Sequence, residues 1–354
     1  MTDSSSEDMT RVDRSGAFWR IAEVIGIRLR LILGVLIGNL RLTHALRGDW
    51  RKRYERAKID LTAAAPIFQP SRQWTIISIF YRLTLRARGL DGFKSTFGRF
   101  LSAYEPGNRR LFEAVHHLYF EELSRRDSWG LLDKMEEPLL GKGSWVLHRG
   151  KRLSLDLLQS IDELYRMKEA LGFERNDRVT FCELGAGYGR LADAVLTAMP
   201  NASYFIFDLP ESLLLSQHYL TTLHPEAKAA LYPESSEVVG SPDALRPYRL
   251  LFALPQFMSR LPPGTVDAFA NIYSFMEMGR EQIDEYFRSI DLLAPKIVYL
   301  KQHKREVNIY DSALNTSENY PIRADWKQIY YGTSALFEHV FEAIYRLPRA
   351  NDKA

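Results

Sequence analysis

One short segment constrains the fold of this chain more than any other, and it reads Phe181-Cys-Glu-Leu-Gly-Ala-Gly-Tyr-Gly-Arg190. It follows a β-like apolar run and precedes a helical pattern, which is the context that a ligand-binding glycine loop requires. Glycine lacks a Cβ, so the backbone can approach a ligand closely, and the following helix N-terminus supplies N–H donors. The segment therefore predicts a strand–loop–helix unit that binds a cofactor.

The spacing of the glycines distinguishes between cofactors. A dinucleotide-binding loop has the pattern G-x-G-x-x-G, but the third position counted from Gly185 and Gly187 is Arg190. The Lys-Ser or Lys-Thr of a phosphate-binding P-loop is also missing. The observed pattern is E-x-G-x-G-x-G, starting at Glu183, and Asp208 ends the next expected strand. A carboxylate there can accept hydrogen bonds from two ribose hydroxyls.

Short apolar strands alternate with helices around this loop, which predicts a doubly wound, mostly parallel sheet. Ser154 is expected to cap a helix that runs to about Leu171. An apolar segment at 341–347 is expected to form an edge strand that closes the sheet. The other expected strands are Val179–Leu184, Tyr204–Asp208, Leu250–Leu254, Val266–Ile272 and Ile297–Lys301, with helices at 188–198 and 211–223.

The loop and the acid resemble motif I and the acidic post-strand-2 position of the class I S-adenosylmethionine-dependent methyltransferases. The resemblance implies a Rossmann-like methyltransferase domain over residues 141–350, with S-adenosyl-L-methionine as its cofactor. It places Glu183, Gly185, Gly187 and Gly189 against the methionine part and Asp208 at the ribose. By their positions in the superfamily, Gln256 is expected to contact the adenine and Asn271 to belong to the cofactor site.

Three further segments are similar to the family of bacterial sugar O-methyltransferases. They are the approach segment from Pro138 to Ser160, the third-strand segment from Leu254 to Pro262, and Tyr273-Ser-Phe-Met-Glu-Met278. This resemblance implies methylation of a sugar hydroxyl in surface or secreted glycan biosynthesis. Two alternatives stay open: a methyltransferase that acts on another small molecule, and a non-catalytic scaffold with this fold at the membrane.

A sugar hydroxyl is a poor nucleophile while protonated, so a base near its oxygen is expected. Ligands of doubly wound sheets lie beyond the C-terminal ends of the strands, which restricts the candidates to residues that follow them. We expect His303 or Glu277 to serve, with His148 as a weaker third candidate. No carboxylate pair has a convincing metal-binding spacing, so no metal is predicted. Aromatic residues that follow the fifth strand are candidates for stacking on a sugar: Tyr310, Tyr320, Trp326, Tyr330 and Tyr331.

The N-terminal part differs in charge from the rest. Residues 1–150 hold 25 Lys and Arg against 17 Asp and Glu, whereas residues 151–354 hold 22 against 27. We expect a disordered leader over residues 1–15 and a basic, mainly helical region over 16–140. The apolar stretch 21–42 is interrupted by charged residues and is too short to span a membrane. It is either a buried helix or part of a 16–60 segment that contacts an anionic membrane.

Composition sets the remaining expectations. A single cysteine, Cys182, excludes a disulfide framework and fits a reducing, cytoplasmic compartment, with the inner face of the membrane as a second location. The net charge of +3 gives no general attraction to nucleic acid. The resemblance implies a sugar or glycan acceptor as partner, and a second copy of the chain is also expected.

Overall fold

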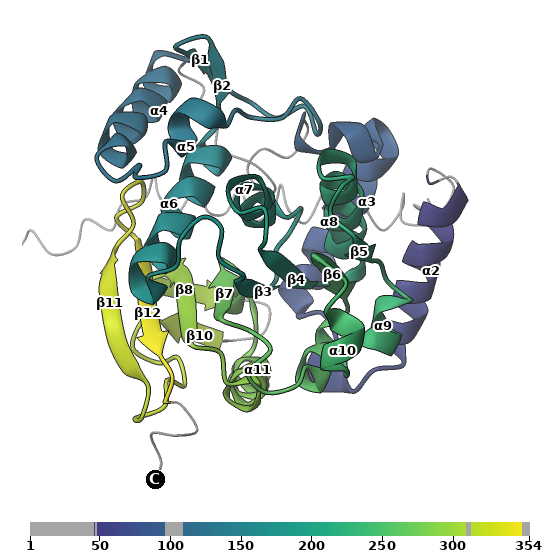
Figure 1. The fold of residues 1–354 in the computed structure, drawn as a ribbon. Coiled ribbons are helices and arrows are strands. Elements are labelled where there is room, and N and C mark those ends of the chain that lie inside the picture. The colour runs from purple at the N-terminus through teal and green to yellow at the C-terminus, as the bar shows by residue number, and fades with distance from the viewer. Residues whose placement is uncertain (1–45, 47, 96–108, 309–312, 349–354) are drawn as a thin grey trace, which may run out of the picture.

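The computed structural model describes residue 46 and residues 48–95, 109–308 and 313–348. Its centre is an eight-stranded sheet in the order β11-β12-β8-β7-β3-β4-β6-β5 (Figure 1). Six neighbouring strands are parallel to one another: β8, β7, β3, β4, β6 and β5. The other two, β12 and β11, are antiparallel to their neighbours. The bounds are β3 (Thr180–Leu184), β4 (Ser203–Phe207), β5 (Ala229–Ala230), β6 (Leu250–Ala253), β7 (Ala268–Ile272), β8 (Ile297–His303), β11 (Lys327–Thr333) and β12 (Val340–Arg346).

This topology confirms the predicted doubly wound, mostly parallel α/β fold. After β3, the chain first forms the strands on one side of it, which lie in the order β4, β6 and β5. It then crosses to the other side of β3 and forms β7 and β8. The five apolar runs expected as strands all lie in the sheet. One expectation was wrong: the strand at 341–347 exists, but β11 lies outside it and forms the edge. The residues of β11 are about half exposed in the structure. Their sequence lacks a long apolar run, so the strand was not recognised.

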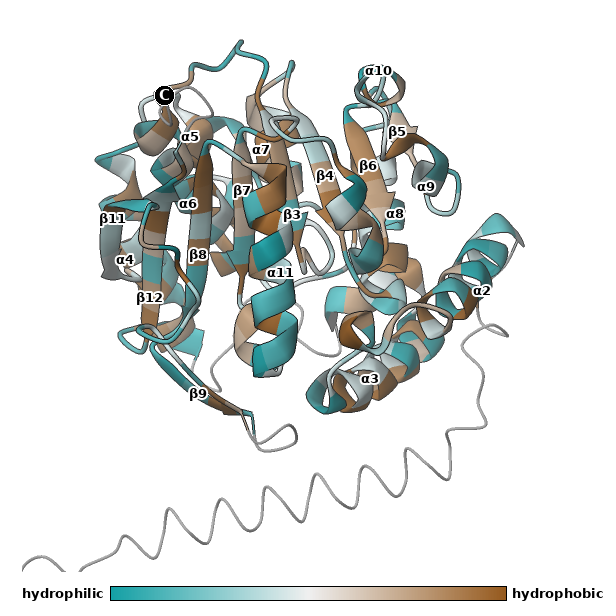
Figure 2. Ribbon diagram, turned by 90° about the horizontal axis from the view of Figure 1, so that it is seen from below, coloured by the Kyte–Doolittle hydropathy of each residue, from teal (hydrophilic) through white to brown (hydrophobic). Residues whose placement is uncertain are grey.

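Helices cover both faces of the sheet (Figures 1 and 2). On one face lie α6 (Leu155–Leu171), α7 (Arg190–Ala198) and α8 (Pro210–Leu223), and on the other lies α11 (Arg280–Leu293). Successive side chains of a strand point to opposite faces, so Tyr204 and Ile206 join the first layer while Phe205 and Phe207 join the second. Smaller elements are α9 (Ser235–Val238), α10 (Pro242–Leu245), η4 (Pro255–Arg260), η5 (Phe275–Glu277), and the strand pairs β1 (Val146–His148) with β2 (Lys151–Leu153) and β9 (Arg305–Asn308) with β10 (Ala313–Thr316).

The helix α6 begins where the sequence predicted. Ser154 is its N-cap, and its hydroxyl accepts a hydrogen bond from the backbone N–H of Leu157 at 3.0 Å. Gly172 ends the helix in the left-handed conformation, which is favourable for a residue without a Cβ. Both helix ends thus follow from local sequence signals.

In its described residues, 48–95 and 109–140, the N-terminal region is mainly helical, as expected, and packs directly on the sheet domain. It contains α2 (Gly48–Thr62), η2 (Pro66–Phe68), α3 (Arg72–Arg88), η3 (Leu90–Ser95), α4 (Arg109–Ser124) and α5 (Leu131–Lys134). Figure 2 shows α2 and α3 lying beyond one end of the strands. Tyr54 on α2 and Arg82 on α3 both donate hydrogen bonds to the buried carboxylate of Glu211 on α8, at 2.8 and 2.7 Å. These bonds fix α2 and α3 against the sheet domain.

The predicted leader and the apolar stretch 21–42 lie outside the described residues. In the part of the chain that the structure describes, no helix is long and apolar enough to cross a membrane. The contact of residues 16–60 with a membrane surface stays a prediction.

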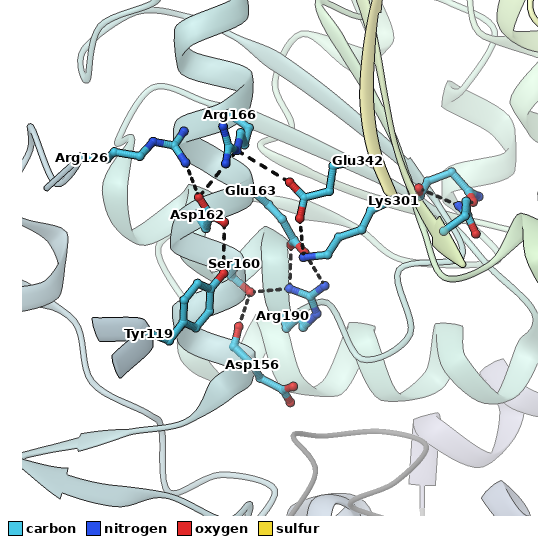
Figure 3. A network of polar contacts seen from close by, with 12 residues as sticks. Tyr119, Arg126, Asp156, Ser160, Asp162, Glu163, Arg166, Arg190, Lys301 and Glu342 are labelled. Carbon is cyan, nitrogen blue, oxygen red and sulfur yellow. Dashed lines mark hydrogen bonds and ion pairs between the residues drawn. The ribbon is translucent and has the colours of Figure 1, made fainter. Parts of the chain in front are cut away.

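A buried ionic network joins α6, α7, β8 and β12 (Figure 3). The fully buried carboxylate of Glu163 accepts two hydrogen bonds from Arg190, at 2.6 and 2.9 Å, and one from Lys301 at 2.9 Å. Lys301 also lies 3.3 Å from Glu342. Burial alone would raise the pKa of Glu163, but Arg190 and Lys301 outweigh it and hold that pKa below its usual value. Each charge in the network therefore depends on its partners.

We predict that Lys301→Met destabilises the fold strongly, because it removes the buried cation shared by Glu163 and Glu342 and leaves Glu163 with Arg190 alone and Glu342 with Arg166 at 3.7 Å. The expected loss in the free energy of unfolding is about 3–5 kcal/mol, measured by urea denaturation. Lys296→Met is the matched control, because Lys296 is 57% exposed and pairs with Asp267 at the surface; it should cost less than about 1 kcal/mol. Equal losses in the two variants would contradict a structural role for Lys301.

Candidate functional site

The glycine loop connects β3 to α7 at the C-terminal edge of the sheet. Gly185, Gly187 and Gly189 all have positive φ values, of +78°, +62° and +90°. A Cβ at Gly185 would lie 2.2 Å from the Ser274 hydroxyl, and one at Gly189 would lie 2.8 Å from Leu220. A Cβ at Gly187 would meet nothing within 4 Å. Packing therefore requires glycine at the two outer positions, while Gly187 faces open space.

That space is a cavity of about 510 Å³, called here the large cavity. The glycine loop lines one side of it, and the face of α3 that carries Trp74 and Ile77 lines another. The segments that follow β7 and β8 also line it, through Glu277 and His303. The C-terminal ends of three strands thus meet one wall of the N-terminal region.

Asp208 lies on the other side of the loop, in a small cavity of about 30 Å³. One of its carboxylate oxygens accepts a hydrogen bond from the Gly187 N–H at 2.8 Å, and the other accepts one from the Leu209 N–H at 2.7 Å. Burial raises the pKa of Asp208 to about 7, although both N–H donors favour the charged form. The predicted glycine loop and the predicted acid therefore contact each other.

The small cavity is covered by the segment from Phe68 to Trp74, called here the covering segment. Gln282 on α11 holds its beginning, because the amide nitrogen donates to the carbonyls of Ile67 and Gln69 at 3.1 and 2.7 Å. Trp74 lines both cavities, as do Gly185 and Ser274. The two cavities thus adjoin at Gly185, Ser274 and Trp74.

Polar groups beneath the loop lack partners. The Oε1 of Gln159 and the hydroxyl of Tyr273 are buried and make no hydrogen bond, and both residues line the large cavity. Glu183 lines it as well and accepts a hydrogen bond from Tyr204 at 2.7 Å. Burial raises the pKa of Glu183 to about 7. Because a buried polar atom without a partner is unfavourable, this part of the cavity fits a polar ligand.

The two candidate bases lie in the same cavity. The Nδ1 of His303 lies 2.7 Å from a carboxylate oxygen of Glu306 on β9, which leaves Nε2 for another partner. Glu277 accepts a hydrogen bond from Trp74. Burial raises the pKa of Glu277 to about 8, and the negative charges of Glu306 and Asp208 act in the same direction. At neutral pH the Glu277 side chain is therefore mainly an uncharged carboxylic acid.

Two other predicted residues have different surroundings. Asn271 is fully buried. Its amide nitrogen donates a hydrogen bond to the Leu184 carbonyl at 2.8 Å, and its amide oxygen accepts one from the Phe275 N–H at 2.9 Å and one from the Gln302 amide at 2.7 Å. These bonds join the ends of β3, β7 and β8, and Asn271 lines neither cavity. Gln256 lines a third cavity, between α2 and η4, rather than the two at the glycine loop.

The expected aromatic sugar platform was wrong, because those side chains have other contacts. Tyr320 and Trp326 are buried and stack on Phe287, with ring centroids 6.4 and 5.9 Å apart. Tyr330 lies under the guanidinium of Arg166, and Tyr331 stacks on Phe341. None of these four lines the large cavity, and Tyr310 lies outside the described residues. His148, the weaker base candidate, pairs with His117 at 2.7 Å instead.

Several cavity residues were missed by the sequence analysis. Trp74 and Ile77 lie in the N-terminal region, which was expected to be helical, and nothing local indicates that this face of α3 meets the glycine loop. Asp156 and Gln159 were recognised only as part of the approach segment. Their spacing of three residues places both side chains on one face of α6. That shared face is the one sequence signal that could have indicated a common role.

Within the described ranges, no group of three or more His, Cys, Asp or Glu side chains could hold a metal ion. The predicted lack of a metal is not tested by that finding.

No family model and no curated protein matches the chain. Among solved structures it is similar to TnmH, with 12% identity over 65% of this chain and 61% of that chain at a TM-score of 0.35. It is also similar to the bifunctional kinase-methyltransferase WbdD (16% identity, 55% of this chain, 38% of that chain, TM-score 0.36). The SAM-dependent methyltransferase from Aquifex aeolicus aligns at 12% identity (53% and 90% of the two chains, TM-score 0.32). The chain thus spans less than two thirds of the first two, and TM-scores this low leave the fold assignment to the topology described above.

The site fits one end of the cofactor that the sequence resemblance implies better than the other. The orphaned Gln159 and Tyr273 atoms and the open face of Gly187 suit a polar amino-acid end in the large cavity. The carboxylate of Asp208 uses one hydrogen bond on each oxygen, so it retains acceptor capacity for hydroxyls. A volume of about 30 Å³ holds one water and not a nucleoside. An adenosine end bound beside Asp208 would therefore require outward movement of the covering segment.

We predict that Gln282→Ala speeds the association of S-adenosylhomocysteine with the protein, because it releases the beginning of the covering segment. Loss of two hydrogen bonds, each worth about 0.5–1.5 kcal/mol, should raise the association rate constant at least about fivefold in stopped-flow fluorescence. The control is Glu281→Gln, an exposed neighbour on the same helix, which should leave the rate unchanged. Identical rates for Gln282→Ala and the wild type would show that this segment does not limit entry.

Proposed function

We propose that this chain is an S-adenosylmethionine-dependent O-methyltransferase that acts on a sugar hydroxyl. The observation that carries the proposal is the direct contact between the glycine loop and Asp208, with a candidate base in the adjoining cavity. Loop, acid and base come from the ends of β3, β4 and β8, which is where ligands of doubly wound sheets bind.

The residues divide the cofactor between the two cavities. Asp208 is placed to accept hydrogen bonds from the ribose hydroxyls, and Glu183, Asp156 and Gln159 present oxygen acceptors to the α-amino group. When bound, S-adenosylmethionine supplies an activated methyl group that passes from its sulfonium to the acceptor oxygen. Gly185, Ser274 and Trp74, at the boundary of the cavities, would surround that region.

The chain's own contribution to the chemistry is to hold the acceptor and remove its proton. Glu306 accepts a hydrogen bond from Nδ1–H of His303, which makes Nε2 the nitrogen that takes the hydroxyl proton. The proton then leaves to solvent through the partly exposed imidazole. Glu277, held by Trp74 and uncharged at neutral pH, is suited to hydrogen-bond an acceptor hydroxyl.

We predict that Asp208→Ala weakens the binding of S-adenosylhomocysteine. Removing a charged acceptor that serves the ribose should cost about 1.5–3 kcal/mol, measured by isothermal titration calorimetry. Asp243→Ala, at an exposed position in α10, is the control and should bind like the wild type. Unchanged affinity in Asp208→Ala would remove the ribose assignment.

The affinity of the wild type for S-adenosylhomocysteine should also rise as the pH increases from about 6 to 8. The reason is that the raised pKa of about 7 leaves Asp208 largely protonated below that range, and the carboxylate is the better acceptor. Asp208→Asn should reduce this pH dependence. Titration in the same buffers tests it, and an unchanged slope in Asp208→Asn would assign the dependence to another group.

We predict different consequences for the two candidate bases. His303→Ala should lower the turnover number by about 10²–10⁴-fold, the usual contribution of a general base. Glu277→Gln should lower turnover less at pH 7, because the amide resembles the uncharged acid. The wild type should change in activity near pH 8, where Glu277 ionises, and Glu277→Gln should lack this change. Steady-state kinetics from pH 6 to 9 separate the two, and normal turnover in His303→Ala would exclude it as the base.

The acceptor is tested on the glycans of the cell that makes this protein. Sugar methyl-ether analysis by mass spectrometry compares a strain without the chain with its parent. One O-methylated sugar should be lost, and it should be restored by the wild type but not by Asp208→Ala. Identical glycans in both strains would contradict a sugar acceptor.

A further inference from the structure

The large cavity extends past the glycine loop to a second region, lined by α3, η5 and the segments around β8 and β12. On the α3 side, Gln73, Trp74, Ile77 and Tyr81 line it; their spacing of one, four and eight residues puts them on one helix face. The α3 wall, as these four residues are called here, therefore belongs to the N-terminal region, to which the sequence assigned no part in the site.

The cationic groups around the cavity are neutralised. Arg190 is the one Lys or Arg among the described residues that line it, and both its terminal nitrogens bond to Glu163 at 2.6 and 2.9 Å. His339 lines the cavity beside His303, with ring centroids 4.9 Å apart. Burial and the neighbouring His303 lower the pKa of His339, so it carries little charge at pH 7. Among the described residues that line the cavity, an anionic acceptor would find no ready counter-charge.

The acidic groups of this second region are also engaged. Glu306 is paired with His303 at 2.7 Å, and Glu277 is bonded to Trp74. A cationic acceptor would therefore have to compete with His303 for Glu306. Because moving a charge from water into a partly buried site without a partner is costly, both signs of charge are disfavoured.

The remaining lining combines hydrogen-bonding groups with apolar ones. Ile77, Phe337 and Val340 offer apolar surface, while Glu277, His303 and Gln73 offer polar atoms. A pyranose or furanose ring has the same division, with C–H groups on its faces and hydroxyls at its rim. Trp74, whose indole N–H is bonded to Glu277, adds an aromatic surface at the boundary with the cofactor region.

We propose that the acceptor enters this region as an uncharged, hydroxyl-bearing ring that packs on the α3 wall. The inference rests on the proposed function and adds the acceptor's charge class and the element that selects it. It rejects uronic acids, phosphorylated sugars and sugars with a free amino group as the methylated unit. In a nucleotide-linked acceptor, the phosphates lie outside the cavity.

The test uses surface glycan from the strain that lacks this chain, so that the acceptor positions are unmethylated. The full-length protein is incubated with this glycan and S-adenosylmethionine that carries a tritiated methyl group. Acid hydrolysis and mass spectrometry then identify the labelled monosaccharide. A neutral O-methyl sugar is expected. Label on a uronic or phosphorylated sugar, or on a sugar whose amino group is free in the intact glycan, overturns this inference alone, whereas no label on any sugar overturns the proposed function as well.

Variants of the wall test the selecting element. Ile77→Ala should raise the KM for the glycan about tenfold while the Kd for S-adenosylhomocysteine stays within twofold, because Ile77 lies on the α3 wall, whereas the groups assigned to the cofactor lie on α6 and at the ends of β3 and β4. Trp74→Phe keeps an aromatic ring and should raise KM less than Trp74→Ala. Thr75→Ala, an exposed position on the same helix that lines neither cavity, is the control. An unchanged KM in both Ile77→Ala and Trp74→Ala would overturn the role of α3.

Discussion

The buried carboxylate of Glu163 organises this site, although it is not itself expected to contact the reacting atoms. Arg190 directly follows the glycine loop, and Lys301 lies two residues before His303. By bonding both cations, Glu163 connects α6 to the loop and to β8. A buried charge without its partners is strongly unfavourable, so these three elements have one favourable arrangement. That arrangement brings the glycine loop and the candidate base to the lining of a single cavity.

The N-terminal helices complete what the sheet domain leaves open. A doubly wound sheet presents its binding residues along one edge, and that edge needs a cover to exclude water from the reaction. Here α3 and the covering segment provide it, held by Glu211 on α8 and Gln282 on α11. Trp74 contacts both the cofactor side and the acceptor side. We therefore propose that the N-terminal half of the chain contributes to acceptor specificity.

The sequence predicted those parts of the fold that depend on local signals. The apolar runs of β3, β4, β6, β7 and β8, the cap at Ser154 and the E-x-G-x-G-x-G loop are all local, and the structure contains each of them. It also brings Asp208, the acid that the resemblance singled out, into contact with Gly187. The edge strand β11 escaped prediction because it is largely exposed and has no apolar run.

Long-range contacts were beyond local signals. The side chain of Asn271 has the chemistry of a ligand contact, but its hydrogen bonds go to three backbone and side-chain groups that only the fold brings together. Tyr320 and Trp326 have the chemistry of a sugar platform, yet Phe287 on α11 buries them. Conversely, Trp74 is separated from the glycine loop by more than a hundred residues, and no spacing rule connects the two.

The central claim is that the two cavities beside the glycine loop hold one molecule of S-adenosylmethionine. A crystal structure of the protein with S-adenosylhomocysteine tests it most directly. The account predicts the amino-acid end beside Gln159 and Glu183, the ribose hydroxyls on Asp208, and the covering segment displaced outward over the adenosine. Density for the ligand elsewhere, or Asp208 still bonded only to Gly187 and Leu209 with the ligand bound, would contradict the account.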